Sequence, residues 1–266
     1  MSNEDLNKLK KIELEVMEYY NEICQKHNLT YYIFYGTLLG AVRHSGFIPW
    51  DDDIDVLMPI DDYKKLLNIL KNDKHDKYYV QNIFNTKYCT YNFTKIRKYH
   101  TTMVEKELNY LKFKKGINID IFPLYKYPKS KFGKIKFQFK SRLASLLLNR
   151  ELKGKSIKSK IIHYSLSIFP RSFLNVIIKI SLNSLANYTG EYNEYRIVHY
   201  KGFPKQWFDE TIYLPFEDKK YLCPKKYDKI LTNLYGDYMT LPPVSERVGH
   251  GEGNIVLSFD KEYNEM

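Results

Sequence analysis

The stretch GTLLGAVRHSGFIPWDDDIDVLM, residues 36–58, is the most informative part of this 266-residue chain. It opens with the pair Gly36-Thr37 and ends in the acidic run DDDID, residues 51–55. Four carboxylates in five positions repel one another in a compact state, so such a run is commonly an exposed, solvated turn. Here apolar residues flank the run on both sides, which favours a partly enclosed site.

The residues around the acidic run predict two short strands joined by a helical segment. Residues 31–35 are aromatic and β-branched and end at Gly36, as in a buried strand, and residues 37–44 can form one or two helical turns. Residues 53–58 alternate acidic and apolar side chains, as in a strand with one face at a polar site. In such a strand Asp53 and Asp55 point to the same face, with Cβ atoms about 6–7 Å apart.

A third acid stands in a separate strand pattern. Residues 116–122, GINIDIF, alternate again, and we expect Pro123 to end that strand. Asp120 is the lone acid of the pattern, and a buried carboxylate needs a partner. Two carboxylates on one face and a third from a neighbouring strand make an oxygen-rich site for Mg²⁺ or Mn²⁺. We therefore predict that Asp53, Asp55 and Asp120 meet at one metal site.

Several other residues are candidates for binding an anionic substrate. Glycine at position 36 lets the backbone approach a phosphate, and the Thr37 hydroxyl and nearby amides can donate to it. Arg43 can hold a phosphate through two hydrogen bonds, or it can neutralise the acidic run. Lys95 and Arg97 alternate on a strand expected over residues 91–98, so they either share a phosphate-binding face or lie on a solvated edge.

Trp50 directly precedes the acids. It can stack on a base or on a quaternary ammonium group, and it can equally be an apolar anchor for the loop. The chain has 25 tyrosines, enough to build an aromatic cage, but the pattern selects none of them.

The remaining sequence predicts an α/β or α+β core followed by helices. Amphipathic spacing indicates a helix over residues 4–26, and a second helix over 61–72 has Asp61-Asp62 as its cap. A further strand is expected over 78–83. Residues 131–188 look wholly helical, and residues 190–266 show one clear helix near 224–235. We divide the chain into a catalytic core (1–125), a basic helical segment (126–189) and a C-terminal segment that completes the active site (190–266).

The charge is concentrated in one part of the chain. The formal net charge is +11, yet residues 126–180 alone hold fourteen Lys and Arg against one acid, and the remainder sums to −2. A uniformly basic nucleic-acid binder would look different. The three scattered cysteines favour neither a disulfide framework nor a zinc ribbon. The polar N-terminus and the absence of a long apolar stretch favour a cytoplasmic protein, with a peripheral position at the inner face of the membrane as an option.

Residues 36–44 and 46–55 together resemble the core motif of the LicD family, which includes bacterial phosphocholine transferases and fukutin-related proteins of the nucleotidyltransferase superfamily. Three later stretches are also similar to that family: KIRK at 95–98, IDIFPL at 119–124 and LYGDYMTLPP at 234–243. The resemblance covers about residues 1–125 and 200–250, and it is weakest in the basic stretch 126–185.

The resemblance implies an α+β fold: a nucleotidyltransferase-like mixed sheet flanked by helices, here with a basic helical insert. It implies metal-dependent transfer of phosphocholine, or a related phospho-alcohol, from CDP-choline or a similar CDP-alcohol to a hydroxyl of a glycan or lipid-linked glycan, with release of CMP. By position, Asp53 and Asp55 would be metal ligands, and Asp120 a third ligand or general base. Family members often follow the Pro-Pro block with Arg and a His pair, whereas this chain has Arg247 and a single His250.

Two alternatives remain open from the sequence. A nucleotidyltransferase that moves the NMP itself would use the same acids. A non-enzymatic module would bind a membrane or RNA through the basic segment, with a purely structural acidic loop. The basic segment itself interleaves Lys and Arg with apolar residues, which suits an anionic membrane surface, a polyanionic acceptor or an ordinary cationic helical subdomain. Nucleic acid is the weakest partner, because no RNA-binding motif accompanies the charge.

Overall fold

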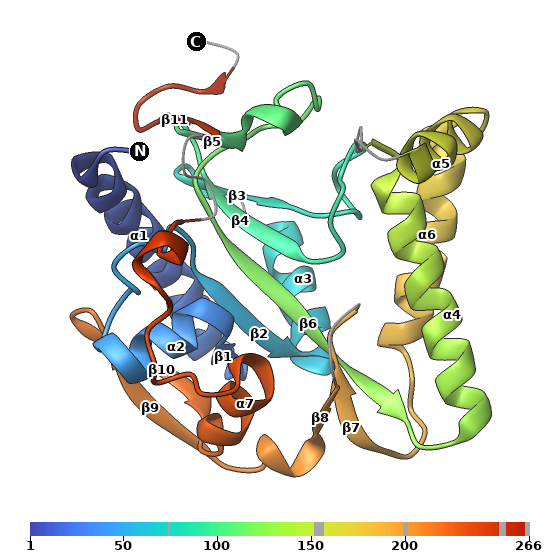
Figure 1. The fold of residues 1–266 in the computed structure, drawn as a ribbon. Helices are drawn as coiled ribbons and strands as arrows, with labels where there is room; N and C mark the ends of the chain where they lie inside the picture. Colours follow the sequence, from blue (N-terminus) through green and yellow to red (C-terminus); the bar gives the residue numbers. More distant parts are fainter. Residues whose placement is uncertain (74, 152–156, 199–201, 250–253, 264–266) are drawn as a thin grey trace.

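The computed structural model describes residues 1–73, 75–151, 157–198, 202–249 and 254–263, and a mixed sheet lies at its centre (Figure 1). The strands follow the order β1 (Tyr32–Ile33), β2 (Asp55–Pro59), β6 (Asn118–Pro128), β4 (Thr94–Lys98) and β3 (Tyr78–Gln81). The long strand β6 also pairs with β7 (Tyr192–Arg196), which pairs with β8 (Gly202–Pro204). Only β2 and β6 run parallel among these pairs of described strands, so the fold is of the α+β class.

Helices α1 (Asn3–Lys26) and α3 (Ile60–Asn72) cover one face of the sheet. The hydroxyl groups of Tyr63 on α3 and Thr94 on β4 lie 2.6 Å apart, and Lys98 on β4 forms an ion pair with Glu15 on α1. Side chains alternate along a strand, so Lys95 and Arg97 of β4 belong to the opposite face. The charged residues predicted for the site therefore lie on the face that α1 and α3 leave uncovered.

The C-terminal part of the chain packs against the first part. Helix α2 (Tyr35–His44) contacts β9 (Thr211–Phe216) and α7 (Tyr227–Tyr235), and β9 forms a hairpin with β10 (Lys219–Pro224). Strand β5 (Thr102–Glu105) pairs with β11 (Ile255–Ser258). One hydrophobic core extends from Val16 to Leu231 and joins α2, β9, β10 and α7 to the central sheet.

A second apolar core lies between α4 (Lys131–Leu148) and α6 (Arg171–Ala186), at the side of the molecule that also carries α5 (Ile157–Ser167). In Figure 1 these three helices stand together, beside the sheet. All three cysteines of the chain are free and buried, as expected for packing residues. No helix in the described part of the chain combines the length and the hydropathy needed to cross a bilayer.

The predicted helices over 4–26 and 61–72 are confirmed. The described part of 131–188 is mostly but not wholly helical, because residues 168–170 separate α5 from α6. Asp61 and Asp62 do not cap the second helix through their side chains. They lie in its first turn, where their charges favour the helix dipole, and Pro59 precedes the helix. The strand expected over 31–35 is reduced to two residues, because Tyr35 already begins α2.

Two further predictions, on the bounds of the strands that carry the site acids, are wrong. Pro123 does not end its strand: β6 continues to Pro128. On one edge β6 pairs with β4 up to Ile121 and with β7 from Tyr125, so Pro123 falls between two ladders, where a missing N–H leaves no gap in either. Asp53 lies before β2, which begins at Asp55, so the argument that one strand aligns Asp53 with Asp55 does not hold.

Candidate active site

Three charged side chains form a row across three adjacent strands. Asp55 on β2 is the register partner of Asp120 on β6, and Asp120 is the register partner of Lys95 on β4. Neighbouring strands lie about 4.8 Å apart, and register partners project to the same face. The structure thus brings Asp120 beside Asp55, although 64 residues of sequence separate them.

Asp120 is held in place by two neighbours. The Lys95 Nζ donates to both carboxylate oxygens, at 2.6 and 2.8 Å, and the Asn118 Nδ2 donates to Oδ1 at 2.7 Å. The ion pair is mostly enclosed, with 17% of the Lys95 side chain and 15% of the Asp120 side chain exposed. Such a pair is screened much less than a surface pair.

Among the residues that the structure describes, Asp55 forms no ion pair comparable to that of Asp120 with Lys95. Burial, and then repulsion from Asp53 and Asp120, raise the pKa of Asp55 well above its usual range, while Lys95 acts in the opposite direction. A carboxyl group in this situation favours either a proton or a cation. The effect of Asp53 also shows that it lies close to Asp55, although it is not on the strand.

These carboxylates have the chemistry of a hard-cation site, but they are not arranged as one here. The described residues contain no group of three or more His, Cys, Asp or Glu side chains that converge on one point. Asp120 turns toward Lys95 and Asn118 instead. The donor set of Asp53, Asp55 and Asp120 fits Mg²⁺ or Mn²⁺ by ligand type, so the metal site stays a prediction.

The N-terminus of α2 binds the acidic loop itself. The Thr37 Oγ1 accepts a hydrogen bond from the Asp55 backbone N–H at 2.8 Å, which fixes the start of β2. A Cβ at Gly36 would lie 2.5 Å from the Asp51 Oδ2, so only glycine lets this buried carboxylate approach the first turn of the helix. The close approach that we predicted for a phosphate is therefore made by Asp51 in this structure.

The C-terminal segment closes over the other side of the acidic loop. The Arg247 guanidinium lies 5.5 Å from the centre of the Trp50 ring, and a Cβ at Gly249 would lie 2.7 Å from the Trp50 carbonyl oxygen. The Arg43 Nη1 donates to the Tyr238 carbonyl at 3.0 Å. Trp50 thus serves at least as an anchor between segments far apart in sequence. His250 lies outside the described residues.

Arg43 does not neutralise the acidic run through its described hydrogen bonds. Its Nε donates to the ring of His44 at 3.0 Å, and its remaining described bond is to the C-terminal segment. Burial and the charge of Arg247 lower the pKa of Arg43. The guanidinium groups of Arg43 and Arg247 repel each other, and an anion such as a phosphate would relieve that repulsion. Phosphate binding by Arg43 stays a prediction.

Arg97 is a buried residue and does not lie on a solvated edge. Only 4% of it is exposed, and it donates to Gln81 at 2.6 Å, to the Gly116 carbonyl at 2.5 Å and to the Asn118 Oδ1 at 2.6 Å. Asn118 in turn donates to Asp120. Arg97 therefore positions Asp120 indirectly, through Asn118. To contact a phosphate directly, the Arg97 guanidinium would have to break these hydrogen bonds.

An aromatic pocket of about 670 Å³ opens beside the row. Tyr91, Phe93 and Phe122 line it, and Phe122 lies on the same face of β6 as Asp120 because it follows two positions later. The Phe93 and Phe122 ring centres are 4.4 Å apart, and the Lys95 Nζ lies 5.2 Å from the centre of the Phe93 ring. Sequence reasoning missed this pocket, although the alternation of IDIF over 119–122 placed an aromatic ring on the face of Asp120.

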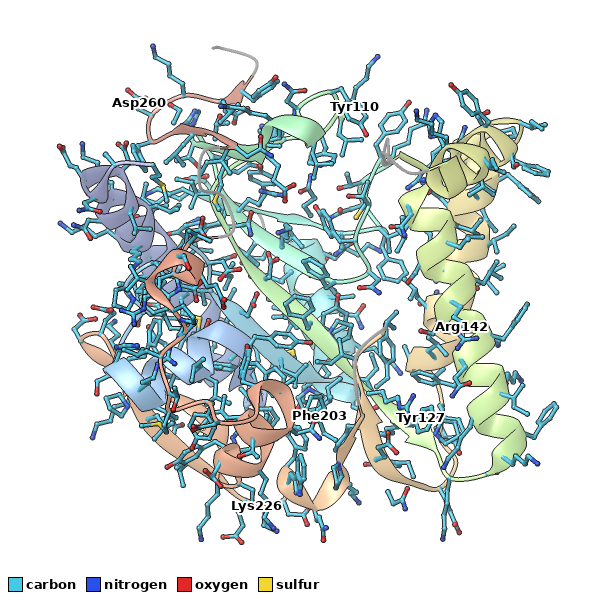
Figure 2. All side chains as sticks on the ribbon, in the orientation of Figure 1. Tyr110, Tyr127, Arg142, Phe203, Lys226 and Asp260 are labelled. Carbon is cyan, nitrogen blue, oxygen red and sulfur yellow. The ribbon has the colours of Figure 1, made fainter. Side chains whose placement is uncertain are left out.

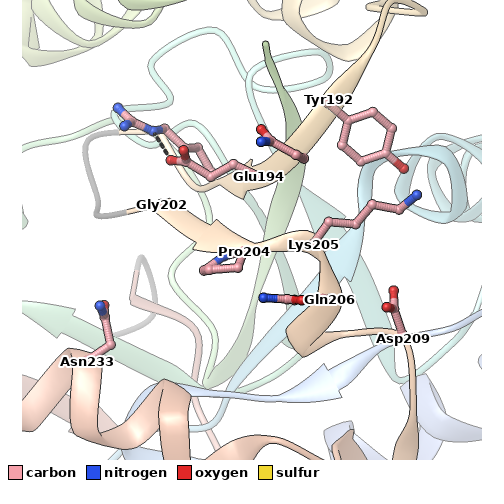
Figure 3. A pocket seen from close by; sticks show the side chains of 10 residues that line it. Tyr192, Glu194, Gly202, Pro204, Lys205, Gln206, Asp209 and Asn233 are labelled. Atoms are coloured by element: carbon pink, nitrogen blue, oxygen red, sulfur yellow. Dashed lines mark hydrogen bonds and ion pairs between the residues drawn. The ribbon is translucent and has the colours of Figure 1, made fainter.

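Another open pocket, of about 910 Å³, lies away from the acids (Figure 3). It is bounded by β7, β8, the turn Lys205–Trp207 and Asn233 of α7. Figure 3 shows Tyr192, Lys205 and Glu194 around it, and none of the predicted site residues lines it. This pocket therefore does not coincide with the row of Asp55, Asp120 and Lys95.

Glu13 is a buried acid that sequence reasoning also missed. It lies on α1, is 0% exposed, and neither carboxylate oxygen has a hydrogen-bond partner in the described structure. One helical turn earlier, the Lys10 Nζ donates to the Ile48 and Pro49 carbonyls, so this part of α1 touches the loop that leads to the acids. Burial, and then the charges of Asp53 and its neighbours, raise the pKa of Glu13 well above its usual range.

This environment predicts a pH-dependent stability for the metal-free protein. The folded state keeps a proton on Glu13 that the unfolded chain releases above a pKa of about 4.3, so stability falls as pH rises toward the folded pKa. In a chelator, the free energy of unfolding of Glu13→Gln, relative to that of wild type, is expected to increase by about 1 kcal/mol or more from pH 5 to pH 8. Thermal unfolding at the two pH values measures this, with exposed Glu22→Gln as the matched control. Equal pH profiles for Glu13→Gln and wild type would contradict the assignment.

The chain is similar to a family model and to individual proteins. Residues 28–175 match the family model of the LicD/FKTN/FKRP nucleotidyltransferase domain. The lipopolysaccharide cholinephosphotransferase LicD of Haemophilus influenzae is 29% identical over 255 residues, which cover 89% of this chain and 92% of that protein. An uncharacterized protein of Rickettsia prowazekii is 34% identical over 129 residues, 46% of this chain and 47% of that protein.

The extent of the family match corrects one expectation. The match ends at residue 175, so it includes α4, α5 and the start of α6. The basic helices therefore belong to the matched domain, whereas the motifs alone indicated that the resemblance is weakest there. The row Asp55, Asp120 and Lys95 lies within the same matched range.

Proposed function

The chain belongs to the LicD/FKTN/FKRP nucleotidyltransferase family, and from this premise we propose that it transfers phosphocholine, or a related phospho-alcohol, from a CDP-activated donor to a glycan. The acceptor is a hydroxyl group of a cell-surface glycan precursor, such as a teichoic acid, lipopolysaccharide or capsule precursor. The observation that carries the proposal is the register row of Asp55, Asp120 and Lys95, with Asp53 beside it. The similarity to a cholinephosphotransferase, which covers 89% of this chain and 92% of that protein, supports the donor class.

The reaction exchanges a phosphoanhydride bond of the donor for a phosphoester bond to the acceptor. The acceptor oxygen attacks the phosphorus that bears the alcohol, the bond from that phosphorus to the bridging oxygen breaks, and CMP leaves with the bridging oxygen and its electron pair. The acceptor's proton passes to a carboxylate of the row. Asp53, Asp55 and Asp120 would hold Mg²⁺ or Mn²⁺, which supplies charge neutralisation for the diphosphate.

The residues around the row have distinct parts in this proposal. Lys95 and Asn118 orient Asp120, and the Lys95 ammonium adds a positive charge beside the phosphates. Arg97 holds Asn118 in place. Asp120 acts as a third ligand or as the proton acceptor.

The aromatic pocket beside the row suits the alcohol of a choline donor. A trimethylammonium group is attracted to the faces of aromatic rings, and Tyr91, Phe93 and Phe122 line the pocket that opens beside the row. We assign the choline to the pocket of Tyr91, Phe93 and Phe122. Phe93→Leu should weaken CDP-choline binding more than CDP-glycerol binding, because only the former carries a cation.

Ligand binding gives the first test. Thermal unfolding is measured with Mg²⁺ and CDP-choline, CDP-ethanolamine, CDP-glycerol or CDP-ribitol. A donor present at about 100 times its Kd stabilises the folded state by about 2.7 kcal/mol, which raises Tm by several degrees. We expect CDP-choline to give the largest rise, and no rise with any of the four would contradict the donor assignment.

Product analysis gives the decisive test of reaction type. CDP-choline labelled separately in choline and in cytidine is incubated with Mg²⁺ and a choline-free extract of lipid-linked glycan. The proposal predicts choline label in the glycan and one CMP released for each choline transferred. Cytidine label in the glycan would identify the enzyme as a nucleotidyltransferase that moves the NMP.

A further inference from the structure

Helices α4, α5 and α6 each expose a stripe of large apolar side chains. The members of a stripe are spaced three or four residues apart, so they lie on one face of their helix. The exposed members are Phe132, Ile135 and Phe139 on α4, Ile161, Tyr164 and Ile168 on and after α5, and Phe169, Phe173, Val176 and Ile180 before and on α6. The exposure is high: Phe132 is 77% and Ile168 is 80% accessible.

These stripes are separate from the faces that hold the fold together. On α4, Phe137, Ala144 and Leu148 are buried, and they lie on the opposite side of the helix from Phe132 and Phe139. On α6, the buried residues include Leu174, Ile178 and Leu182, again opposite the stripe. Figure 2 shows side chains extending from these helices away from the sheet. Exposed apolar side chains grouped along helices in this way mark a binding face.

The charge around the stripes is almost entirely positive. Residues 126–180 carry fourteen Lys and Arg against one acid, while the rest of the chain sums to −2. Lys131 and Lys136 flank the stripe of α4, and Lys160 flanks that of α5; all three are exposed. An apolar stripe bordered by Lys and Arg is the pattern of a helix that lies in the surface of an anionic bilayer.

Charge decides between the occupants of this face. A second copy of the chain would bring +13 against +13, which opposes association through the same surface. Nucleic acid would satisfy the lysines but leave the apolar stripes facing phosphates and water. An anionic lipid surface satisfies both, since its headgroups pair with the lysines and its acyl region accepts the rings.

We propose that α4, α5 and α6 form a membrane-docking face, with Phe132, Phe139 and Phe173 inserting into the surface of an anionic bilayer. The face binds peripherally, with the three helices parallel to the membrane surface. The inference does not depend on the proposed function, because lipid binding needs neither donor nor turnover. It would place the enzyme where lipid-linked acceptors are found.

Co-sedimentation of the full chain with vesicles tests the proposal. Phosphatidylcholine vesicles are compared with phosphatidylcholine–phosphatidylglycerol vesicles, each at low and at high salt. We expect binding to the anionic vesicles that weakens with salt, and little binding to the neutral ones. Lys131→Gln, Lys136→Gln and Lys160→Gln together should reduce binding at low salt by about 100-fold.

Two further variants separate insertion from simple attraction. Phe132→Ser, Phe139→Ser and Phe173→Ser together should reduce binding by about tenfold or more without a change in charge. The control variant Lys11→Gln, Lys71→Gln and Lys229→Gln removes three exposed lysines elsewhere and should bind within about threefold of wild type. Thermal unfolding confirms that each variant is folded, and calorimetry should show unchanged CDP-choline affinity for both lysine variants.

Several outcomes would overturn the proposal. Wild type that does not sediment with anionic vesicles, or a phenylalanine variant that sediments like wild type, would exclude insertion. Binding to a soluble polyanion such as heparin, with no binding to vesicles, would assign the face to a polyanionic ligand. A dimer in solution that the phenylalanine substitutions dissociate would assign it to a second copy of the chain.

Discussion

Asp55→Asn is expected to lower transfer by about 10³-fold or more, while the fold stays intact. Asp55 is the acid of the row for which the described part of the chain supplies no ion-pair partner comparable to Lys95, and the proposed cation would be that partner. Because burial and neighbouring acids raise the pKa of Asp55, ionising it at neutral pH costs folding free energy, and a neutral amide avoids that cost. The metal-free variant should therefore unfold at the same temperature as wild type or higher.

The measurement combines turnover at saturating Mg²⁺ with thermal unfolding in a chelator. Asp218→Asn is a suitable control, since it removes an exposed carboxylate from the turn between β9 and β10. The control should keep wild-type turnover. An Asp55→Asn variant with near-wild-type turnover would show that Asp55 is not a metal ligand.

Asp120→Asn is expected to lower transfer by about 100-fold or more and to raise the Mg²⁺ concentration needed for half-maximal rate. The asparagine oxygen can still accept from Asn118 and Lys95, but its amide nitrogen cannot accept the second bond from Lys95, so the row loses one hydrogen bond and one negative charge. We expect a loss of stability of about 1 kcal/mol, because the enclosed Lys95 loses its counterion.

The same strand offers a matched control for this ion pair. Lys126 on β6 pairs with Asp61 on α3 at 2.6 Å, and the Asp61 side chain is 56% exposed. Asp61→Asn also removes one ion pair from β6, but it should leave turnover and Mg²⁺ dependence unchanged. If Asp120→Asn lost stability but kept its Mg²⁺ dependence, Asp120 would be a structural residue only.

The polar face on which the row lies could be predicted, because it depends on alternation alone. An acid inside an apolar strand pattern, as at Asp55 and Asp120, shows which face is polar, and Lys95 follows the same rule on β4. The order of the strands could not be predicted in this way. The parallel pairing of β2 with β6 depends on tertiary contacts that the sequence pattern does not record.

Other features required knowledge of which segments meet. Pro123 was predicted to end its strand. The strand tolerates this proline because it lies between the pairing with β4 and the pairing with β7, and the sequence does not show where those pairings end. Gly36 was predicted to let a phosphate approach the backbone. In the structure the carboxylate of Asp51 makes that close approach instead, which the sequence pattern does not show. Glu13 looked like one more polar residue of an amphipathic helix, and only the packing of α1 against the loop at Ile48 shows that it is enclosed.

The basic segment is a different case. Its composition showed the concentration of positive charge, but its apolar spacing did not show which side chains are exposed. The charge could be counted from the sequence, but the exposure of Phe132 and Phe173 could not. Apolar residues at helical spacing are usually core, and here two apolar faces occur on one helix. Only the packing of α4 against α6 distinguishes the face that is buried from the face that is exposed.

The most direct test of the central claim is an anomalous difference map from crystals grown with Mn²⁺ and CDP-choline. The account predicts a manganese peak bound by the carboxylates of Asp55 and Asp120, with Asp53 within reach and the donor diphosphate as a further ligand. Choline density should lie against Phe93 and Phe122. A manganese peak away from these acids would contradict it. So would a CDP-choline molecule bound elsewhere, with Lys95 still bound to both carboxylate oxygens of Asp120.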